Sequence, residues 1–159
     1  MPLKIDKENF KTCSGTSQLP YIRDGRRSIG YRNFILKQND VSGIYEEGGN
    51  LTAPIFVDRI SIGMYNMDLH QIKGCKYDDF ASKIPLPFFI PLRALSNIDI
   101  SNMLVIGRAI AQDFYVSSAT RTPTTEIGIG ASSMIIATFM LSSNINSVWN
   151  LIDCPECIM

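Results

Sequence analysis

The 159-residue chain contains a single histidine, His70, only four cysteines, and no excess of either charge. One histidine excludes any site that needs two, such as the paired histidines of zinc metalloproteases. Four cysteines are too few for a disulfide scaffold, and 15 basic against 15 acidic residues give no electrostatic footprint for nucleic acid or an anionic membrane. We therefore expect no metal ion, no nucleic-acid partner and no membrane partner.

The chain also lacks a polarity pattern typical of targeting or membrane insertion. Its first twelve residues are too polar for a secretory signal, which predicts a cytoplasmic protein. Residues 127–152 carry no charge, but glycine, serine and asparagine interrupt them, and the continuous apolar block at 134–141 is too short for a bilayer core. Because threonines, Pro123 and Glu126 precede this stretch, we expect a buried core helix over 125–142.

The rest of the sequence predicts an α+β fold. Alternation of Ile60, Ile62 and Met64 with more polar or smaller residues indicates a strand within 53–69. Three prolines between 85 and 91 favour an edge or irregular extended segment. The apolar run 103–106 is typical of a short buried strand, possible in a parallel sheet, and the glycine-rich stretch 38–52 predicts a surface loop.

The start of the predicted helix has both a functional and a structural interpretation. Free backbone N–H groups from Glu126 to Gly130, with Arg121 just upstream, suit a phosphate or an electron-rich ring edge. The alternative is that Gly128 and Gly130 serve tight helix packing. These glycines do not form a dinucleotide-binding turn, because Pro123 and its threonine neighbours leave no strand before them.

Basic and titratable residues elsewhere leave similar alternatives. Asp68 and His70 would point to the same face at the end of the strand, although a lone histidine is more often structural than catalytic. The isolated pair Cys154 and Cys157 does not predict a metal or redox site. A cluster of arginines forms either a solvated face or a site for carboxylate or phosphate recognition; it comprises Arg23, Arg26, Arg27 and Arg32.

Taken in order, five blocks resemble the C-terminal part of glutathione-reductase-like, FAD-dependent oxidoreductases. They are LPYIRDGRRSIG at 19–30, DRISIGMYNMDLH at 58–70, LPFFIPLRAL at 86–95, DISNMLVIGRAIAQ at 99–112 and SSATRTPTTEIGIG at 117–130. The resemblance implies an incomplete Rossmann-like flavoprotein fold, with substrate-domain strands followed by the last strand and C-terminal helix of a FAD-binding domain. The expected organisation is a polar lead-in at 1–18, a substrate-side or cap-like segment at 19–98, the FAD-domain part at 99–143 and a tail at 144–159.

The same resemblance implies FAD as the cofactor and assigns roles to particular residues. The arginine-rich block, together with Asp68 and His70, would belong to the substrate side, with His70 and Arg27 as candidates for catalysis. A negative charge on reduced flavin would be stabilised by the dipole of the C-terminal helix. The residues implied to contact FAD are Arg93, Gly107, Arg108, Arg121 and Gly130.

The sequence departs from the family pattern in two ways. Met134 stands where such helices carry a second small residue, and the chain contains no Gly-x-Gly-x-x-Gly turn for the nucleotide half of FAD. We therefore expect a fragment or split part of an oxidoreductase that needs a separate chain for nucleotide binding. The alternative is a non-catalytic remnant or interaction module that associates with itself through exposed apolar surface.

Overall fold

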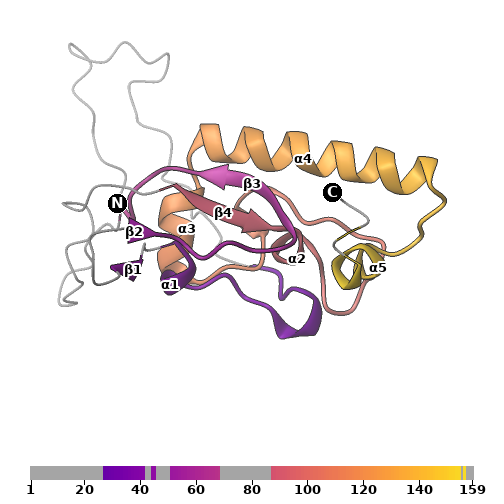
Figure 1. Cartoon of the computed structure of the whole chain (residues 1–159), viewed down its shortest axis with the longest axis horizontal. Helices are drawn as coiled ribbons and strands as arrows, with labels where there is room; N and C mark the ends of the chain where they lie inside the picture. The colour runs from indigo at the N-terminus through magenta and orange to yellow at the C-terminus, as the bar shows by residue number, and fades with distance from the viewer. Residues whose placement is uncertain (1–26, 42–43, 46–50, 69–86, 155, 157–159) are drawn as a thin grey trace, which may run out of the picture.

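The computed structural model describes residues 27–41, 44–45, 51–68, 87–154 and 156, and within these the chain has an α+β fold. Two antiparallel two-stranded sheets are present (Figure 1), the first formed by β1 (Ile44–Tyr45) and β2 (Leu51–Thr52), the second by β3 (Arg59–Gly63) and β4 (Phe88–Pro91). The α-helices are α1 (Gln38–Val41), α2 (Leu92–Leu95), α3 (Phe114–Thr120), α4 (Pro123–Ser142) and α5 (Val148–Asp153), and two short 3-10 turns are η1 (Tyr31–Asn33) and η2 (Gly107–Ala109).

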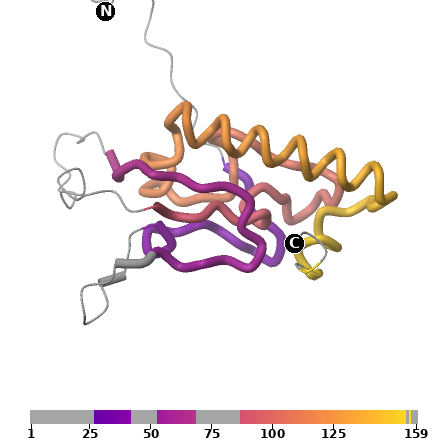
Figure 2. The backbone as a smooth tube through the Cα atoms, turned by 45° about the horizontal axis from the view of Figure 1, so that its top comes forward, coloured from indigo at the N-terminus to yellow at the C-terminus, as the bar shows by residue number. Residues whose placement is uncertain are grey.

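The β3–β4 hairpin lies between α4 and the segment 27–41, as the views in Figures 1 and 2 agree. Gly63 pairs with Phe88, and a Cβ on Gly63 would collide with the Phe88 ring, so this strand end requires a glycine. On the other side, Ser132 of α4 donates a 2.6 Å hydrogen bond to the carbonyl of Ile60. The helix therefore packs directly against β3.

Helix α4 begins at Pro123, two residues before the expected start. Thr122 is the extended N-cap residue and Pro123 occupies the first turn, where its missing N–H costs no hydrogen bond. The expectation of a helix ending at Ser142 is confirmed. Its buried side chains recur every three or four residues and form one face, consisting of Thr125, Ile129, Ser133, Ile136 and Met140.

The expectation that α4 is a buried core helix is wrong, because its opposite face is exposed. We call this the outer face of α4; its large apolar residues are Ile127, Met134, Ile135, Phe139 and Leu141, exposed by 71, 69, 70, 38 and 84%. Helix α4 is long and apolar enough to span a bilayer by length and composition alone, a property that core helices share. Only 22% of its most apolar window is buried, since one face alone meets the hairpin.

Three further expectations need correction. Residues 103–106 do not form a strand, because Val105 bonds to Leu95 and no neighbouring strand lies beside the segment in the described residues. Residues 38–52 are not only a loop, since they contain α1, β1 and β2. In β3, Ile62 is exposed, and Met64 just beyond it is exposed too, because a register shift between Arg59 and Ser61 interrupts the alternation.

The proline-punctuated segment contains an edge strand, one of the two forms expected for it, followed by a helical turn. Within it, β4 pairs with β3 and Pro91 stands at the strand's end, just before α2. Leu92, Ala94 and Leu95 of α2 are all fully buried. Expected turn residues do occur downstream, where the Asn97 side chain accepts hydrogen bonds from the N–H groups of Asp99 and Ile100, both at 2.9 Å.

A buried ion pair joins the start of the hairpin to its end. The side chain of Asp58 is fully buried and accepts hydrogen bonds from Nη2 of Arg93 at 2.6 Å, from its Nε at 2.9 Å and from its backbone N–H at 3.0 Å. The hydrogen bonds to Asp58 raise the pKa of Arg93 above its usual value. The pair therefore favours the charged form of the guanidinium.

Replacing Asp58 by Ala tests how far the fold depends on this pair. Loss of the buried carboxylate leaves the Arg93 charge uncompensated. We therefore expect the free energy of unfolding to fall by about 3–5 kcal/mol. The control is Asp153→Ala, which breaks the exposed pair with Arg32 at 2.9 Å and should cost less than about 1 kcal/mol. Urea unfolding followed by circular dichroism measures both; equal losses would show that Asp58 has no special role.

Candidate functional site

Gly107 and Arg108 form a sharp turn beside α4. Gly107 has a φ of +65°, which favours glycine, and a Cβ there would meet nothing within 4 Å. Arg108 is exposed and forms no ion pair within the described residues. Because η2 contacts α4, the turn and the helix form one surface. We call the surface made by η2 and α4 the η2–α4 surface. It combines the free space beside Gly107 with the guanidinium of Arg108, which has no ion-pair partner among the described residues.

Arg121 lies just before the first turn of α4. The guanidinium of Arg121 donates a 3.0 Å hydrogen bond to the carbonyl of Asp68 and lies 3.5 Å from its carboxylate. The family resemblance implied that Arg121 contacts FAD and that Asp68 belongs to the substrate side. The structure joins them, so Arg121 is already partly neutralised.

The available backbone N–H groups lie earlier on the helix than predicted. Glu126 donates its N–H to the carbonyl of Thr122, which begins the intrahelical hydrogen bonds. Thr124 and Thr125 therefore carry the N–H groups that lack a helical acceptor, while Gly128 and Gly130 lie inside the helix. The expected stretch of free groups from Glu126 to Gly130 is wrong because the helix starts at Pro123. The dipole of this 20-residue helix still favours an anion at its first turn.

The two glycines of α4 have different surroundings. A Cβ on Gly128 would lie 2.7 Å from the hydroxyl of Ser61, so this glycine serves close packing against β3. A Cβ on Gly130 would meet nothing within 4 Å. The packing alternative is therefore right for Gly128. At Gly130, no described residue lies close enough to require a glycine.

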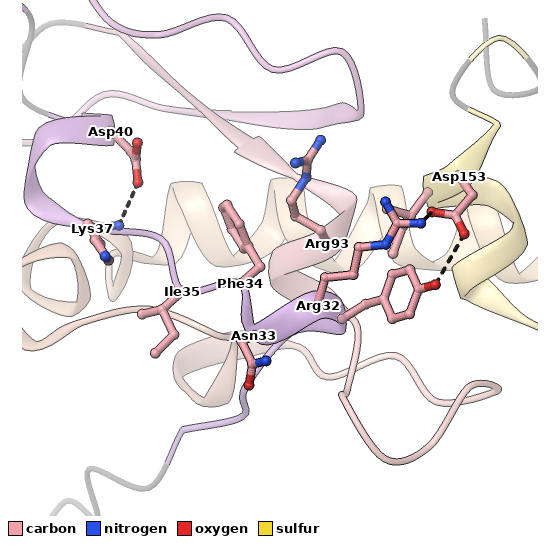
Figure 3. A pocket seen from close by; sticks show the side chains of 10 residues that line it. Arg32, Asn33, Phe34, Ile35, Lys37, Asp40, Arg93 and Asp153 are labelled. Atoms are coloured by element: carbon pink, nitrogen blue, oxygen red, sulfur yellow. Dashed lines mark hydrogen bonds and ion pairs between the residues drawn. The ribbon is translucent and has the colours of Figure 1, made fainter.

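Arg93 lies apart from the other predicted cofactor residues. Its side chain is held by Asp58, lies 5.4 Å from the centre of the Phe34 ring, and faces a separate pocket (Figure 3). We call this the Arg93 pocket. It has a volume of about 450 Å³ and is lined by Tyr31, Arg32, Asn33, Phe34, Ile35, Lys37, Asp40, Arg93, Ile152 and Asp153. The structure thus divides the five predicted residues, because Gly107, Arg108, Arg121 and Gly130 do not line this pocket.

The two candidates for catalysis differ in what the structure shows of them. His70 lies outside the described residues, as do Arg23 and Arg26. Arg27 is half-buried, and its Nε is buried without a hydrogen-bond partner in the described part of the chain. Arg27 is therefore more than a solvated surface residue.

Sequence reasoning missed the residues that hold these arginines in place. Asp58 orients Arg93 across 35 positions, and Asp153 accepts hydrogen bonds from Tyr31 at 3.1 Å and pairs with Arg32. One signal was visible for Asp58, which is the single acid within the mostly apolar stretch APIFVDRISIG. Nothing in the spacing indicated Asp153, because it lies more than 100 residues from its partners.

The cysteine pair is only partly described. Cys154 is disulfide-bonded, and Cys157 lies outside the described residues. Among the residues that the structure describes, no group of three or more potential metal ligands is present.

Alanine substitutions at two glycines should have opposite effects on stability. Gly107→Ala forces a side chain into a left-handed conformation, and we expect a loss of about 1–2 kcal/mol. Gly130→Ala meets no obstruction and improves helix propensity, so we expect a gain of up to about 1 kcal/mol. Urea unfolding without added cofactor measures both, and a loss at Gly130 equal to that at Gly107 would contradict the geometry.

A comparison with protein families identifies the chain. The model of a family described as FAD dependent oxidoreductase matches residues 4–153. Searches of curated proteins and of solved structures found no match. The match covers almost all of the 159 residues, including η2, α4 and the Arg93 pocket. The chain therefore belongs to the FAD-dependent oxidoreductase family.

Proposed function

We propose that this chain supplies the flavin-facing and substrate-side part of a FAD-dependent oxidoreductase of the glutathione-reductase-like type. The nucleotide-binding part, with its Gly-x-Gly-x-x-Gly turn, is supplied from outside the 159 residues, for example by a separate chain. The observation that carries this proposal is the outer face of α4, a large apolar surface with no charge. Such a surface is typical of a helix that packs on two sides.

The energetics of the outer face favour a second layer of structure. Ile127, Met134 and Leu141 recur at seven-residue spacing and are exposed by 69–84%. Full burial of one such side chain is worth about 1.5–3 kcal/mol, so a partner covering these three gains several kcal/mol. Small residues at Gly130 and Ala131 lie between them and allow a close approach. The face therefore suits a protein surface rather than water.

The segment 103–106 supports the same partner. It forms neither helix nor strand, Ile106 at its end is extended, and within the described residues its one backbone hydrogen bond to another segment is the 2.7 Å bond from Val105 to Leu95. Its other backbone groups have no backbone partner in another segment of the described residues and could pair with a neighbouring strand. Gly107 follows the carboxyl end of this segment. In open α/β sheets, ligands bind at the carboxyl ends of the strands. A partner with a parallel sheet would meet both this open edge and the adjacent η2–α4 surface.

The described residues fit part of FAD. Arg108 supplies an unpaired cation for a phosphate, Gly107 and Gly130 leave room for close approach, and the first turn of α4 favours negative charge on the flavin ring. FAD, when bound, supplies the hydride or electron transfer. Arg93 does not fit this role, because Asp58 holds it in a separate pocket. Nothing among the described residues forms a site for adenosine, so we infer weak FAD binding by this chain alone.

One observation favours a second candidate function. Met134, at the position where the family resemblance implies a small residue, is 69% exposed on the outer face. A long side chain there hinders the close approach of a cofactor. The second candidate is therefore a non-catalytic module that associates through this face without FAD.

Flavin retention separates the two candidates. The chain purified with excess FAD should retain little flavin, whereas co-expression with the nucleotide-binding half of a family member should give a near-stoichiometric visible flavin band. In that complex Arg108→Ala should weaken FAD binding about tenfold through the loss of one charge-assisted contact. The control is Arg59→Ala, an exposed arginine in β3. A colourless complex would support the non-catalytic module instead, and equal retention by Arg108→Ala would refute the placement of the cofactor.

Negative charge on the outer face of α4 should prevent association with the nucleotide-binding half of a family member. Met134 and Ile135 are both about 70% exposed, so Met134→Glu with Ile135→Glu should change the stability of the free chain little. Burying two carboxylates at an apolar interface is costly, and co-purification should be lost. The matched control is Ile55→Glu with Val57→Glu, which puts two glutamates at apolar residues exposed by 68 and 61% that lie outside α4. Undiminished association of the glutamate variant would show that the outer face is not the docking surface.

A further inference from the structure

The Arg93 pocket is separate from the η2–α4 surface, and the proposed function leaves it unexplained. Its walls come from three parts of the chain: the segment 31–40, which runs from η1 into α1, the start of α2 and the last turn of α5 (Figure 3). A volume of about 450 Å³ lies within the range of small-molecule sites. The pocket therefore has the size for a ligand of its own.

One wall of the pocket has an unfavourable backbone conformation. Arg32 and Asn33 have φ angles of +58° and +60°, which side chains seldom adopt. The surrounding structure holds this turn through paired backbone hydrogen bonds between Gly30 and Phe34, at 2.9 and 3.2 Å. Backbone held in such a conformation at the edge of a cavity is typical of binding sites.

The base of this turn is fixed by Tyr31. Its N–H donates to the hydroxyl of Ser96 at 2.8 Å, and its ring stacks on Trp149 at 4.9 Å between ring centres. Trp149 in turn donates its indole N–H to the carbonyl of Asn97 at 3.0 Å. The turn and α5 are thus tied to the same part of the fold, so the pocket is formed before any ligand binds.

The two acidic side chains that line the pocket, Asp40 and Asp153, both accept hydrogen bonds from other residues. Asp153 pairs with Arg32 through one oxygen and accepts a hydrogen bond from Tyr31 through the other. Asp40 accepts the backbone N–H of Lys37 at 2.7 Å. The charge of Asp153 is thus compensated by Arg32, whereas Asp40 accepts a neutral N–H group and keeps its charge, so it is the one carboxylate of the lining that a cation could pair with.

Two cationic groups remain available. The ammonium group of Lys37 forms no ion pair within the described residues. Asp58 engages Nε and Nη2 of Arg93 and leaves Nη1 without a partner among the described residues, while 30% of the side chain is exposed. The buried carboxylate fixes the plane of the guanidinium, so this donor is oriented in advance.

Apolar groups complete the lining between these cations. Phe34 presents its ring beside Arg93, and Ile35 and Ile152 also line the pocket. We propose that the Arg93 pocket binds a small organic oxyanion, a carboxylate or a phosphate ester with a flat or apolar body. The oxyanion lies against Lys37 and Arg93, and the body contacts Phe34. This site does not depend on FAD.

Calorimetric titration of the full chain without FAD tests the proposal, with benzoate and phenyl phosphate as separate probes. We expect saturable binding of at least one probe, and the stronger of the two identifies the headgroup. Lys37→Ala should weaken binding about tenfold, since it removes a charge-assisted contact at an exposed residue. Asp153→Asn should tighten binding several-fold, because Arg32 then loses its acidic partner and becomes available to the anion.

The opposite signs of these two changes distinguish binding from a structural effect. Arg59→Ala, which removes an exposed arginine that does not line the pocket, is the matched control and should leave binding unchanged. Absence of saturable binding by both probes would overturn the proposal. Equal weakening by Arg59→Ala and Lys37→Ala, or weaker binding by Asp153→Asn, would also overturn it. Because FAD is absent, the result is independent of the flavin experiment.

Discussion

The buried ion pair between Asp58 and Arg93 is the constraint on which the other parts of the structure depend. A carboxylate without solvent exposure is stable only when it is neutralised and hydrogen-bonded, and Arg93 does both through its side chain and its backbone N–H. Leu92 adds a 2.7 Å hydrogen bond from its N–H to the carbonyl of Asp58. The pair therefore closes the β3–β4 hairpin and fixes α2 at its end.

Helix α2 then positions two functional surfaces. The carbonyls of Leu95 and Ala94 accept the N–H groups of Val105 and Ala111, which hold the segment containing Gly107 and Arg108. The side chain of Arg93 meanwhile lines a pocket that Gly107 and Arg108 do not line. A single interaction thus supports both the η2–α4 surface, on which we propose that flavin lies, and the Arg93 pocket.

The sequence predicted what local chemistry determines and missed what distant contacts determine. The α+β class and the end of α4 were predictable, because hydroxyl and proline residues start a helix and its apolar residues recur regularly. The strand expected at 103–106 was not formed, since a strand needs a neighbour and local apolarity does not supply one. The helices α3 and α5 were not predicted at all. The separation of Arg93 from Arg108 was equally hidden, because it depends on Asp58, 35 positions away.

The central claim is that the open segment 103–106 and the outer face of α4 together receive a nucleotide-binding unit. Hydrogen–deuterium exchange, measured on the free chain and on its complex with the nucleotide-binding half of a family member, tests this claim most directly. The account predicts that the amides of Leu104 and Ile106 exchange much more slowly in the complex, as do those along α4. Unchanged exchange at 103–106, with new protection confined to the Arg93 pocket, would contradict it.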